Sequence, residues 1–394
     1  MLLATIKQLA AQIKQETIEK RRHLHANPEL SFKEFNTSAF IKKQLDQLGI
    51  RWQAMAQTGV VAIIKGEQPS DKVIALRADM DALPITEANT FPFISQNPGV
   101  MHACGHDAHT ASLLGTASIL QSLKQQFGGT IKLIFQPAEE RLPGGASIMI
   151  KEGVLNNPTP QSIIAQHVMP SLECGKIALR PGKHMASMDE IFITVRGKGG
   201  HGAQPHQNTD PVLIASHIVV ALQQLVSRMA NPSIPTVLTI GKVIANGAIN
   251  ITPGEVYMEG TFRTFDEPWR KQAHAQIKKV ATGVAESMGG QCDITIDYGY
   301  PFLVNDEKTA LAVKMLAAEY LGQSNVVEAD LWMAAEDFAY YTQQANACFY
   351  LLGTGNAQKG IGSALHTPTF TIDEDALEIS TGLMAYIATR QLNG

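Results

Sequence analysis

Apolar residues recur every three or four positions in two stretches near the start of the chain, residues 6–24 and 34–48, with Lys, Glu and Gln between them. This spacing predicts two amphipathic helices. Shorter apolar runs, which are typical of buried strands, follow at 59–64, 72–77, 130–135 and 162–166. A helix of small and apolar residues is predicted at 107–123. Strands that alternate with helices in this way predict an α/β fold.

The pattern changes near residue 186. From here strands and helices follow the order β-α-β-β-α-β, at 189–196, 211–229, 236–243, 251–264, 269–288 and 292–298. This order is the split βαβ arrangement, and it predicts an inserted α+β domain of residues 186–299. The first pattern then returns, with helices at 307–321 and 373–390 and a strand at 347–352. We therefore expect residues 1–185 and 300–394 to form one domain.

Composition narrows the classes of partner. The 394 residues carry a formal net charge of −4, so the sequence predicts no basic surface and no nucleic-acid partner. Four dispersed cysteines without a CxxC pair favour a reducing compartment. No apolar run reaches about 18 residues, and no small-residue cleavage site follows the N-terminus. We expect a cytoplasmic protein with no membrane partner.

The strongest chemical signal is the stretch 100–109, which holds three His, one Cys and one Asp. Cys104 and His106 flank a glycine, so both side chains can point into one pocket from a tight loop. Such groups are costly to bury unless something binds them, which indicates a metal site. Two alternatives stay open from these residues alone: Cys104 is a buried core thiol, or it is a nucleophile activated by His106.

Potential ligands also follow three predicted strands. They are Asp79 and Asp81 after 72–77, Glu139 and Glu140 after 130–135, and His167 after 162–166. Open α/β sheets build their sites at the carboxyl ends of strands, so these side chains are expected to meet. One of two adjacent carboxylates can hold a metal while its neighbour activates water. The alternative for Asp79 or Asp81 is that each only caps a turn.

Histidines elsewhere in the sequence are further candidates. His23 and His25 lie near a predicted helix end, where surface or capping roles are favoured over metal ligation. The glycine-rich loop 197–206 lacks a P-loop ending and a strand-to-helix GxGxxG context, so nucleotide binding is disfavoured. We instead expect that the loop holds a functional histidine, His201 or His206, on a mobile segment. His366 is one more candidate, just before the last predicted helix.

Taken together, these motifs resemble the M20 metallopeptidase clan, specifically its amidohydrolase branch of aminoacylase, hippurate hydrolase and indole-acetyl-amino-acid hydrolase types. The resemblance covers nearly the whole chain and runs through residues 22–30, 77–84, 101–107, 136–140, 167–170 and 365–368. It implies a mixed-sheet, zinc-peptidase-like catalytic domain. It also implies hydrolysis of N-acyl amino acids to a carboxylate and a free amino acid.

The resemblance further implies a set of site residues. Two divalent ions, Zn, Mn, Ni or Co, would be held by Cys104, His106, Glu140, His167 and His366, with Cys104 in the place of a bridging carboxylate. Glu139 would be the general base, and Asp81 would orient a ligand. Asp79 replaces the clan's usual ligand His, and its role stays open.

The insert would be the lid and dimerisation domain, giving a homodimer or higher homo-oligomer. His201 would stabilise the oxyanion, often from the partner subunit, while Asn250 and Arg263 would grip the substrate carboxylate. The alternative for Arg263 is a strand-surface charge. Alternatives for the whole chain are a metallo-dipeptidase or carboxypeptidase of the same clan, a Cys104-dependent thiol hydrolase, and a metal-binding protein without catalysis.

Overall fold

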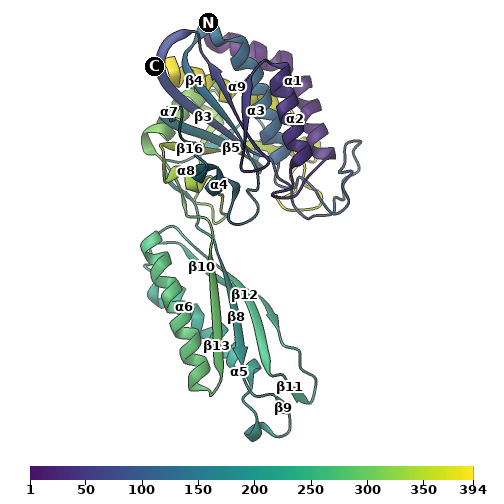
Figure 1. The fold of residues 1–394 in the computed structure, drawn as a ribbon, viewed down its shortest axis with the longest axis vertical. Coiled ribbons are helices and arrows are strands. Elements are labelled where there is room, and N and C mark those ends of the chain that lie inside the picture. The colour runs from purple at the N-terminus through teal and green to yellow at the C-terminus, as the bar shows by residue number, and fades with distance from the viewer. Residues whose placement is uncertain (394) are drawn as a thin grey trace. The chain divides into compact units, whose positions relative to one another are not determined.

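The computed structural model describes residues 1–393, and the chain forms two compact units. The first comprises Met1–His184, Val304–Asp330 and Asp337–Gly394, and the second comprises Met185–Leu303 and Leu331–Glu336 (Figure 1). The sequence pattern predicts residues 331–336 in the first domain. They belong to the second unit because the Ala186 N–H donates to the carbonyls of Trp332 and Ala334, at 3.1 and 3.0 Å.

A mixed sheet of eight strands forms the centre of the first unit, in the order β1-β2-β4-β3-β5-β16-β6-β15. The strands are β1 (Arg51–Met55), β2 (Gly59–Lys65), β3 (Gln68–Asp79), β4 (Gly128–Gln136), β5 (Ser162–Glu173), β6 (Ile177–Leu179), β15 (Val326–Glu328) and β16 (Ala347–Gly355). Strands β4, β3, β5 and β16 are parallel neighbours, whereas β1, β2 and the β16–β6 pair are antiparallel. The α/β class and the mixed sheet predicted from the sequence are confirmed.

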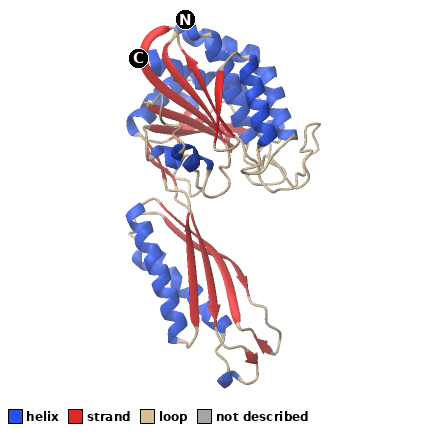
Figure 2. Cartoon of the chain, in the orientation of Figure 1, coloured by secondary structure: helices blue, strands red, loops and turns tan. Residues whose placement is uncertain are grey.

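Helices cover this sheet (Figure 2). They are α1 (Leu2–Ala26), α2 (Phe35–Gln47), α3 (His106–Ser122), α4 (Gly145–Lys151), α7 (Glu307–Leu321), α8 (Ala339–Thr342) and α9 (Ala376–Asn393). Nearly every residue of α3 is buried, which its run of small residues permits. A Cβ at Gly115 would lie only 2.8 Å from Thr381 of α9 and 2.9 Å from Thr17 of α1, so this glycine allows three helices to pack closely.

Strand β5 is longer than the sequence predicted. The apolar run ends at Gln166, but β5 continues to Glu173, so His167 lies inside the strand and opposite Leu351 of β16. The sequence does not predict that the strand continues, because Pro170 cannot donate a hydrogen bond to a neighbouring strand and so argues against a strand at this position. The pairing with β16 becomes irregular after Met169, next to this proline.

The second unit has a four-stranded antiparallel sheet in the order β10-β12-β8-β13. Its strands are β8 (Asp189–Arg196), β10 (Thr236–Ile244), β12 (Glu255–Thr264) and β13 (Gln291–Tyr298), and its helices are α5 (Pro211–Gln224) and α6 (Glu267–Ser287). Alternate residues of β8 pack with both helices in one apolar core, so both helices cover the same face of the sheet. The predicted strand 251–264 is divided at Pro253 and Gly254. In the same unit the short strand β11 (Ile251–Thr252) pairs with β9 (Gly200–His201). Two further short strands, β7 (Gly182–Met185) and β14 (Leu303–Asn305), span the positions in the chain at which one unit ends and the other begins.

Candidate metal centre

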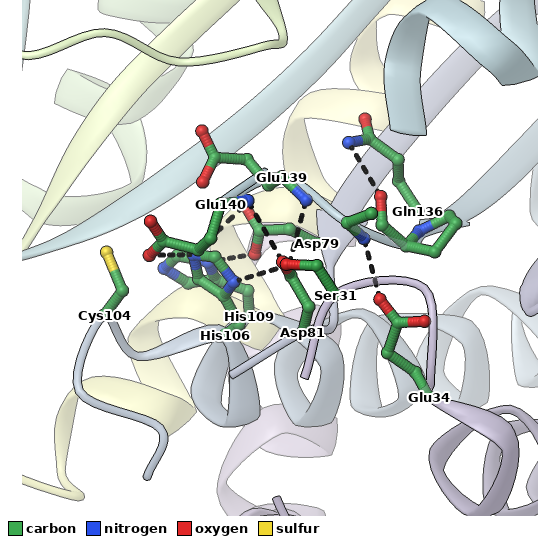
Figure 3. Close-up of polar contacts among 12 residues, drawn as sticks. Ser31, Glu34, Asp79, Asp81, Cys104, His106, His109, Gln136, Glu139 and Glu140 are labelled. Carbon is green, nitrogen blue, oxygen red and sulfur yellow. Dashed lines mark hydrogen bonds and ion pairs between the residues drawn. The ribbon is translucent and has the colours of Figure 1, made fainter. Parts of the chain in front are cut away.

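The carboxyl ends of β3 and β4 lie side by side, because the two strands are parallel and Asp79 is paired with Gln136. The segments that follow them carry Asp81, Glu139 and Glu140. These side chains, separated by about sixty residues in sequence, therefore gather in one place (Figure 3).

Cys104 lies at the centre of a group of donor atoms. Its Sγ is 3.3 Å from the Nε2 of His167 and 3.3 Å from the Nε2 of His366. Gly105 gives the sharp turn that separates Cys104 from the start of α3: its φ is 82°, and a Cβ there would lie 2.4 Å from the Val168 side chain. No residue with a side chain fits this position without displacing its neighbours.

Glu140 extends the group. Its Oε1 lies 3.3 Å from the Nε2 of His366 and 3.9 Å from the Nε2 of His106. The groups of donor atoms that lie within 4.8 Å of one another include Cys104 with His106 and His167, Cys104 with Glu140 and His366, and His106 with Glu139 and Glu140. The structure thus brings together all five ligands expected from the sequence.

Asp81 holds members of this group in position through contacts of its carboxylate. Its Oδ1 accepts the Glu139 N–H at 3.0 Å and lies 3.2 Å from the Nδ1 of His106, while its Oδ2 accepts the Glu140 N–H at 3.0 Å and the Ser31 hydroxyl at 2.6 Å. Figure 3 shows these contacts converging on one carboxylate. Burial acts to raise the pKa of Asp81, but the His106 and Ser31 hydrogen bonds hold it below its usual value. Asp81 is therefore an ionised acceptor that fixes the His106 ring and the backbone of both glutamates.

Two buried atoms show that this site suits a cation. In residues 1–393, the Nε2 of His106 and the Oε1 of Glu140 make no hydrogen bond. Buried polar atoms are nearly always paired, so each such atom needs an explanation, and a bound metal ion is one. Four carboxylates, those of Asp79, Asp81, Glu139 and Glu140, lie around them. Imidazole, thiolate and carboxylate donors in this number fit divalent transition-metal ions.

The pKa shifts agree with this fit. Burial alone would lower the pKa of His106, but the carboxylates of Asp79 and Asp81 raise it to about 10. Burial, with the charges of Glu140 and Glu139, raises the pKa of Cys104 well above its usual value. The excess of negative charge therefore draws protons onto these donors, and a metal cation satisfies the same charge in their place.

Glu139 is buried at 6% exposure, and its Oε1 accepts the Asp337 N–H at 3.4 Å. The residue before it, Ala138, has a φ of 51°, which is unusual for a residue with a Cβ. This backbone turn is held by Glu34, whose Oε1 accepts the Ala138 N–H at 2.8 Å. Burial and the nearby Asp81 raise the pKa of Glu34 to about 7.

One residue near the site, His109, is given no role by the sequence analysis. His109 lies one turn into α3, and its Nδ1 is 2.6 Å from the Oδ1 of Asp79. Its Nε2 accepts the Val168 N–H at 2.9 Å. The spacing of three between His106 and His109 is the signal for His109, because residues at i and i+3 share one helix face.

The expectation that His25 has a surface or capping role is wrong. The side chain is buried, with its Nδ1 at 2.8 Å from Asp107 and its Nε2 at 3.0 Å from Glu87. Arg21, one turn earlier, donates from Nε to the same Asp107 oxygen at 2.8 Å. Asp107 follows His106, so this buried cluster fixes the start of α3. The signal was the i, i+4 spacing of Arg21 and His25.

The remaining predicted residues lie in the second unit. His201 and Asn250 are exposed neighbours, since the Gly202 N–H donates to the Asn250 carbonyl at 2.8 Å. His206 is exposed in the turn at 205–207. Arg263 is half-buried on β12, and its guanidinium donates to the Met333 carbonyl at 3.0 Å. Burial lowers the pKa of Arg263.

Comparison with known proteins shows the family of this chain. The model of peptidase family M20/M25/M40 matches residues 75–390. An N-acyl-L-amino acid amidohydrolase of Geobacillus stearothermophilus is 46% identical over 301 residues, which cover 76% of this chain and 80% of that protein. Thermostable carboxypeptidase 2 of Saccharolobus solfataricus is 38% identical over 100% of this chain and 99% of its own.

A solved structure is also similar over the full length. The crystal structure of Bacillus subtilis YXEP protein, a dinuclear metal-binding peptidase from the M20 family, superposes with a TM-score of 0.83 at 36% identity. The match covers 97% of this chain and 99% of that one. The resemblance seen in the sequence motifs is confirmed: this chain belongs to peptidase family M20/M25/M40, within its amidohydrolase branch.

Proposed function

We propose that this protein hydrolyses the amide bond of N-acyl amino acids to a carboxylic acid and a free amino acid. Its family membership makes it a metal-dependent hydrolase of amide bonds. The observation that carries the proposal is a set of five converging donors with a further buried carboxylate, Glu139, beside them. A ligand set with an adjacent acid–base group can both hold a metal and transfer a proton.

Five side chains would hold two divalent ions, Zn, Mn, Ni or Co. They are Cys104, His106, Glu140, His167 and His366. When bound, such ions supply Lewis acidity that polarises a carbonyl and activates water. Asp81 acts through others: its contacts hold His106 and the backbone of Glu139 and Glu140 in place.

Glu139 moves the proton. As general base it accepts a proton from the attacking water, and as general acid it delivers that proton to the nitrogen that leaves. The Asp337 N–H holds one of its oxygens at 3.4 Å, which restricts the rotation of the carboxylate. Glu139 is buried, so the proton is kept from exchange with bulk water during the reaction.

Residues of the second unit would bind the substrate. We assign to His201 the donation of a hydrogen bond to the oxyanion, and to Asn250 and Arg263 the binding of the α-carboxylate. Arg263 is half-buried, and a partly desolvated guanidinium binds a carboxylate more strongly than an exposed one. This burial also argues against a simple strand-surface charge.

A substrate panel tests the function. We expect N-acetyl, N-benzoyl or long-chain N-acyl amino acids to be hydrolysed, a chelator to abolish turnover, and added Mn, Zn, Ni or Co to restore it. Turnover of dipeptides alone would favour the alternative, a metallo-dipeptidase or carboxypeptidase of the same family. If the protein binds metal but hydrolyses none of these substrates, the result would favour the alternative of a metal-binding protein without catalysis.

The thiol hydrolase alternative predicts activity that is indifferent to chelators. The structure speaks against it, because a nucleophilic cysteine needs a lowered pKa, whereas burial and two carboxylates raise the pKa of Cys104.

We also propose that the second unit forms a homodimer. Strand β10 is an edge strand, and α5 exposes Leu213 at 50% and Val220 at 72%. Residues 211–229 are long and apolar enough to cross a membrane by length and composition alone, but the opposite side of this helix packs in the core of the unit. An edge strand beside an apolar helix suits pairing with a second copy.

Val220→Glu is therefore expected to convert a dimer to a monomer in size-exclusion chromatography with light scattering, because it places a charge in the interface. Gln272→Glu, which adds the same charge to an exposed position of α6, is the matched control. A wild-type protein that is monomeric at micromolar concentration would contradict the proposed dimer.

The four free cysteines further support a cytoplasmic location, which cell fractionation tests.

A further inference from the structure

A buried carboxylate–imidazole pair lies behind the metal centre. The Oδ1 of Asp79, at the end of β3, is 2.6 Å from the Nδ1 of His109, and both side chains are at most 1% exposed. The other oxygen of Asp79 accepts the Arg77 guanidinium at 2.6 Å. Both carboxylate oxygens are therefore engaged by cationic or N–H donors.

The second nitrogen of His109 is also engaged. Its Nε2 accepts the Val168 N–H at 2.9 Å, so the ring proton belongs on Nδ1, facing Asp79. Pairing of β3 with β5 ends at Arg77 opposite Ala165. Beyond that point β3 offers Val168 no strand partner, and the His109 ring accepts its N–H instead.

Val168 connects this pair to a proposed ligand. Its carbonyl accepts the Nδ1–H of His167 at 2.8 Å, which turns the Nε2 of His167 to within 3.3 Å of the Cys104 sulfur. The chain of contacts thus runs from Asp79 through His109 and the Val168 backbone to His167. Each link fixes the orientation of the next.

We propose that Asp79 and His109 are positioning residues for His167, and that neither binds a metal ion. The lone pair of His109 that could bind a metal points at the Val168 N–H. One oxygen of Asp79 contacts the Nδ1 of His109, and the other accepts a hydrogen bond from Arg77. The inference rests on the proposed metal centre and assigns a function to the Asp79 carboxylate, which the sequence left open. Arg77 also donates to Asp337 at 2.8 Å, which anchors the chain of contacts at its far end.

Asp79→Asn tests the inference. The amide keeps the shape of the carboxylate but can present its NH₂ group to His109, which favours the wrong ring tautomer and sets two N–H groups against each other at Val168. We expect the affinity of the metal-free protein for Zn or Co to fall by about 10–100-fold, measured by competition with a chromophoric chelator. The Val168 amide should also exchange its hydrogen faster.

The second unit offers a matched control. Asp189 is a fully buried carboxylate that accepts from Arg270 at 2.9 Å and lies 2.7 Å from the Nε2 of His274. Asp189→Asn removes the same kind of charge from the same kind of triad in the other unit. Metal affinity should remain at the wild-type value, although stability falls. An equal loss of affinity in both variants would show a general structural effect and overturn the proposal.

The remaining outcomes are distinct. Wild-type affinity in Asp79→Asn would overturn the positioning role while leaving the metal centre intact. Wild-type protein that binds no divalent ion would instead overturn the proposed function. If Asp79→Asn does not fold, the ¹⁵N shifts of His109 in wild-type protein decide: a proton on Nδ1 with and without Zn supports the inference, and a proton on Nε2 overturns it.

Discussion

Glu139→Gln is expected to lower turnover by about 10²–10⁴-fold while the metal content stays at the wild-type value. The substitution removes the group that accepts and returns the proton. It retains an oxygen that can accept the Asp337 N–H, so the local structure should be preserved. The Michaelis constant should change little, because Glu139 is assigned no part in holding the substrate.

The measurement combines kinetics with metal analysis by mass spectrometry. Glu140→Gln, one residue further along, is the matched comparison: it should lose metal as well as activity, because Glu140 Oε1 faces His106 and His366. Wild-type turnover in Glu139→Gln would remove this residue from the mechanism. Loss of metal in Glu139→Gln would make it a ligand instead.

Cys104→Ala is expected to lose both bound metal and activity. The sulfur lies 3.3 Å from the Nε2 of His167 and 3.3 Å from the Nε2 of His366, so its removal opens the centre of the donor group. Metal affinity should fall by more than the roughly 100-fold that the loss of a supporting residue costs. Chelator competition on the metal-free variant measures this directly.

Cys348→Ala is the control for this experiment. Cys348 is also a fully buried thiol, but it packs in the apolar core of the first unit, so its loss should lower stability without changing metal affinity. Full metal content with no activity in Cys104→Ala would contradict the ligand assignment. It would favour a nucleophilic thiol.

Much of the fold could be predicted because its signal is local. The apolar run 130–135 lies within β4, and the small-residue run 107–123 matches α3 to within one residue. Each pattern needs only the periodicity of neighbouring side chains. The domain boundary near residue 186 could be predicted for the same reason, because the order of strands and helices changes there. The exception, β5, shows the limit: whether a strand continues past Pro170 depends on its partner, β16.

The candidate ligands were also accessible from the sequence, because each lies in a short motif next to a strand or helix. Cys104 and His106 flank Gly105, whose positive φ produces the turn their spacing indicated. Glu139 and Glu140 follow the apolar run of β4. Residue type and spacing carry this information, since few other functions explain such side chains at buried strand ends.

The sequence by itself determined the α/β class, the inserted segment and the residue types that are candidates for metal donors. Only the tertiary structure decided which groups support them: the engagement of Asp79 with His109, the burial of His25 against Asp107, and the position of residues 331–336 in the second unit. Hydrogen-bond partners of buried polar groups are chosen by segments that meet in space. Their separation along the chain leaves no periodic signal, so the choice appears only when β3, α3 and β5 have packed together.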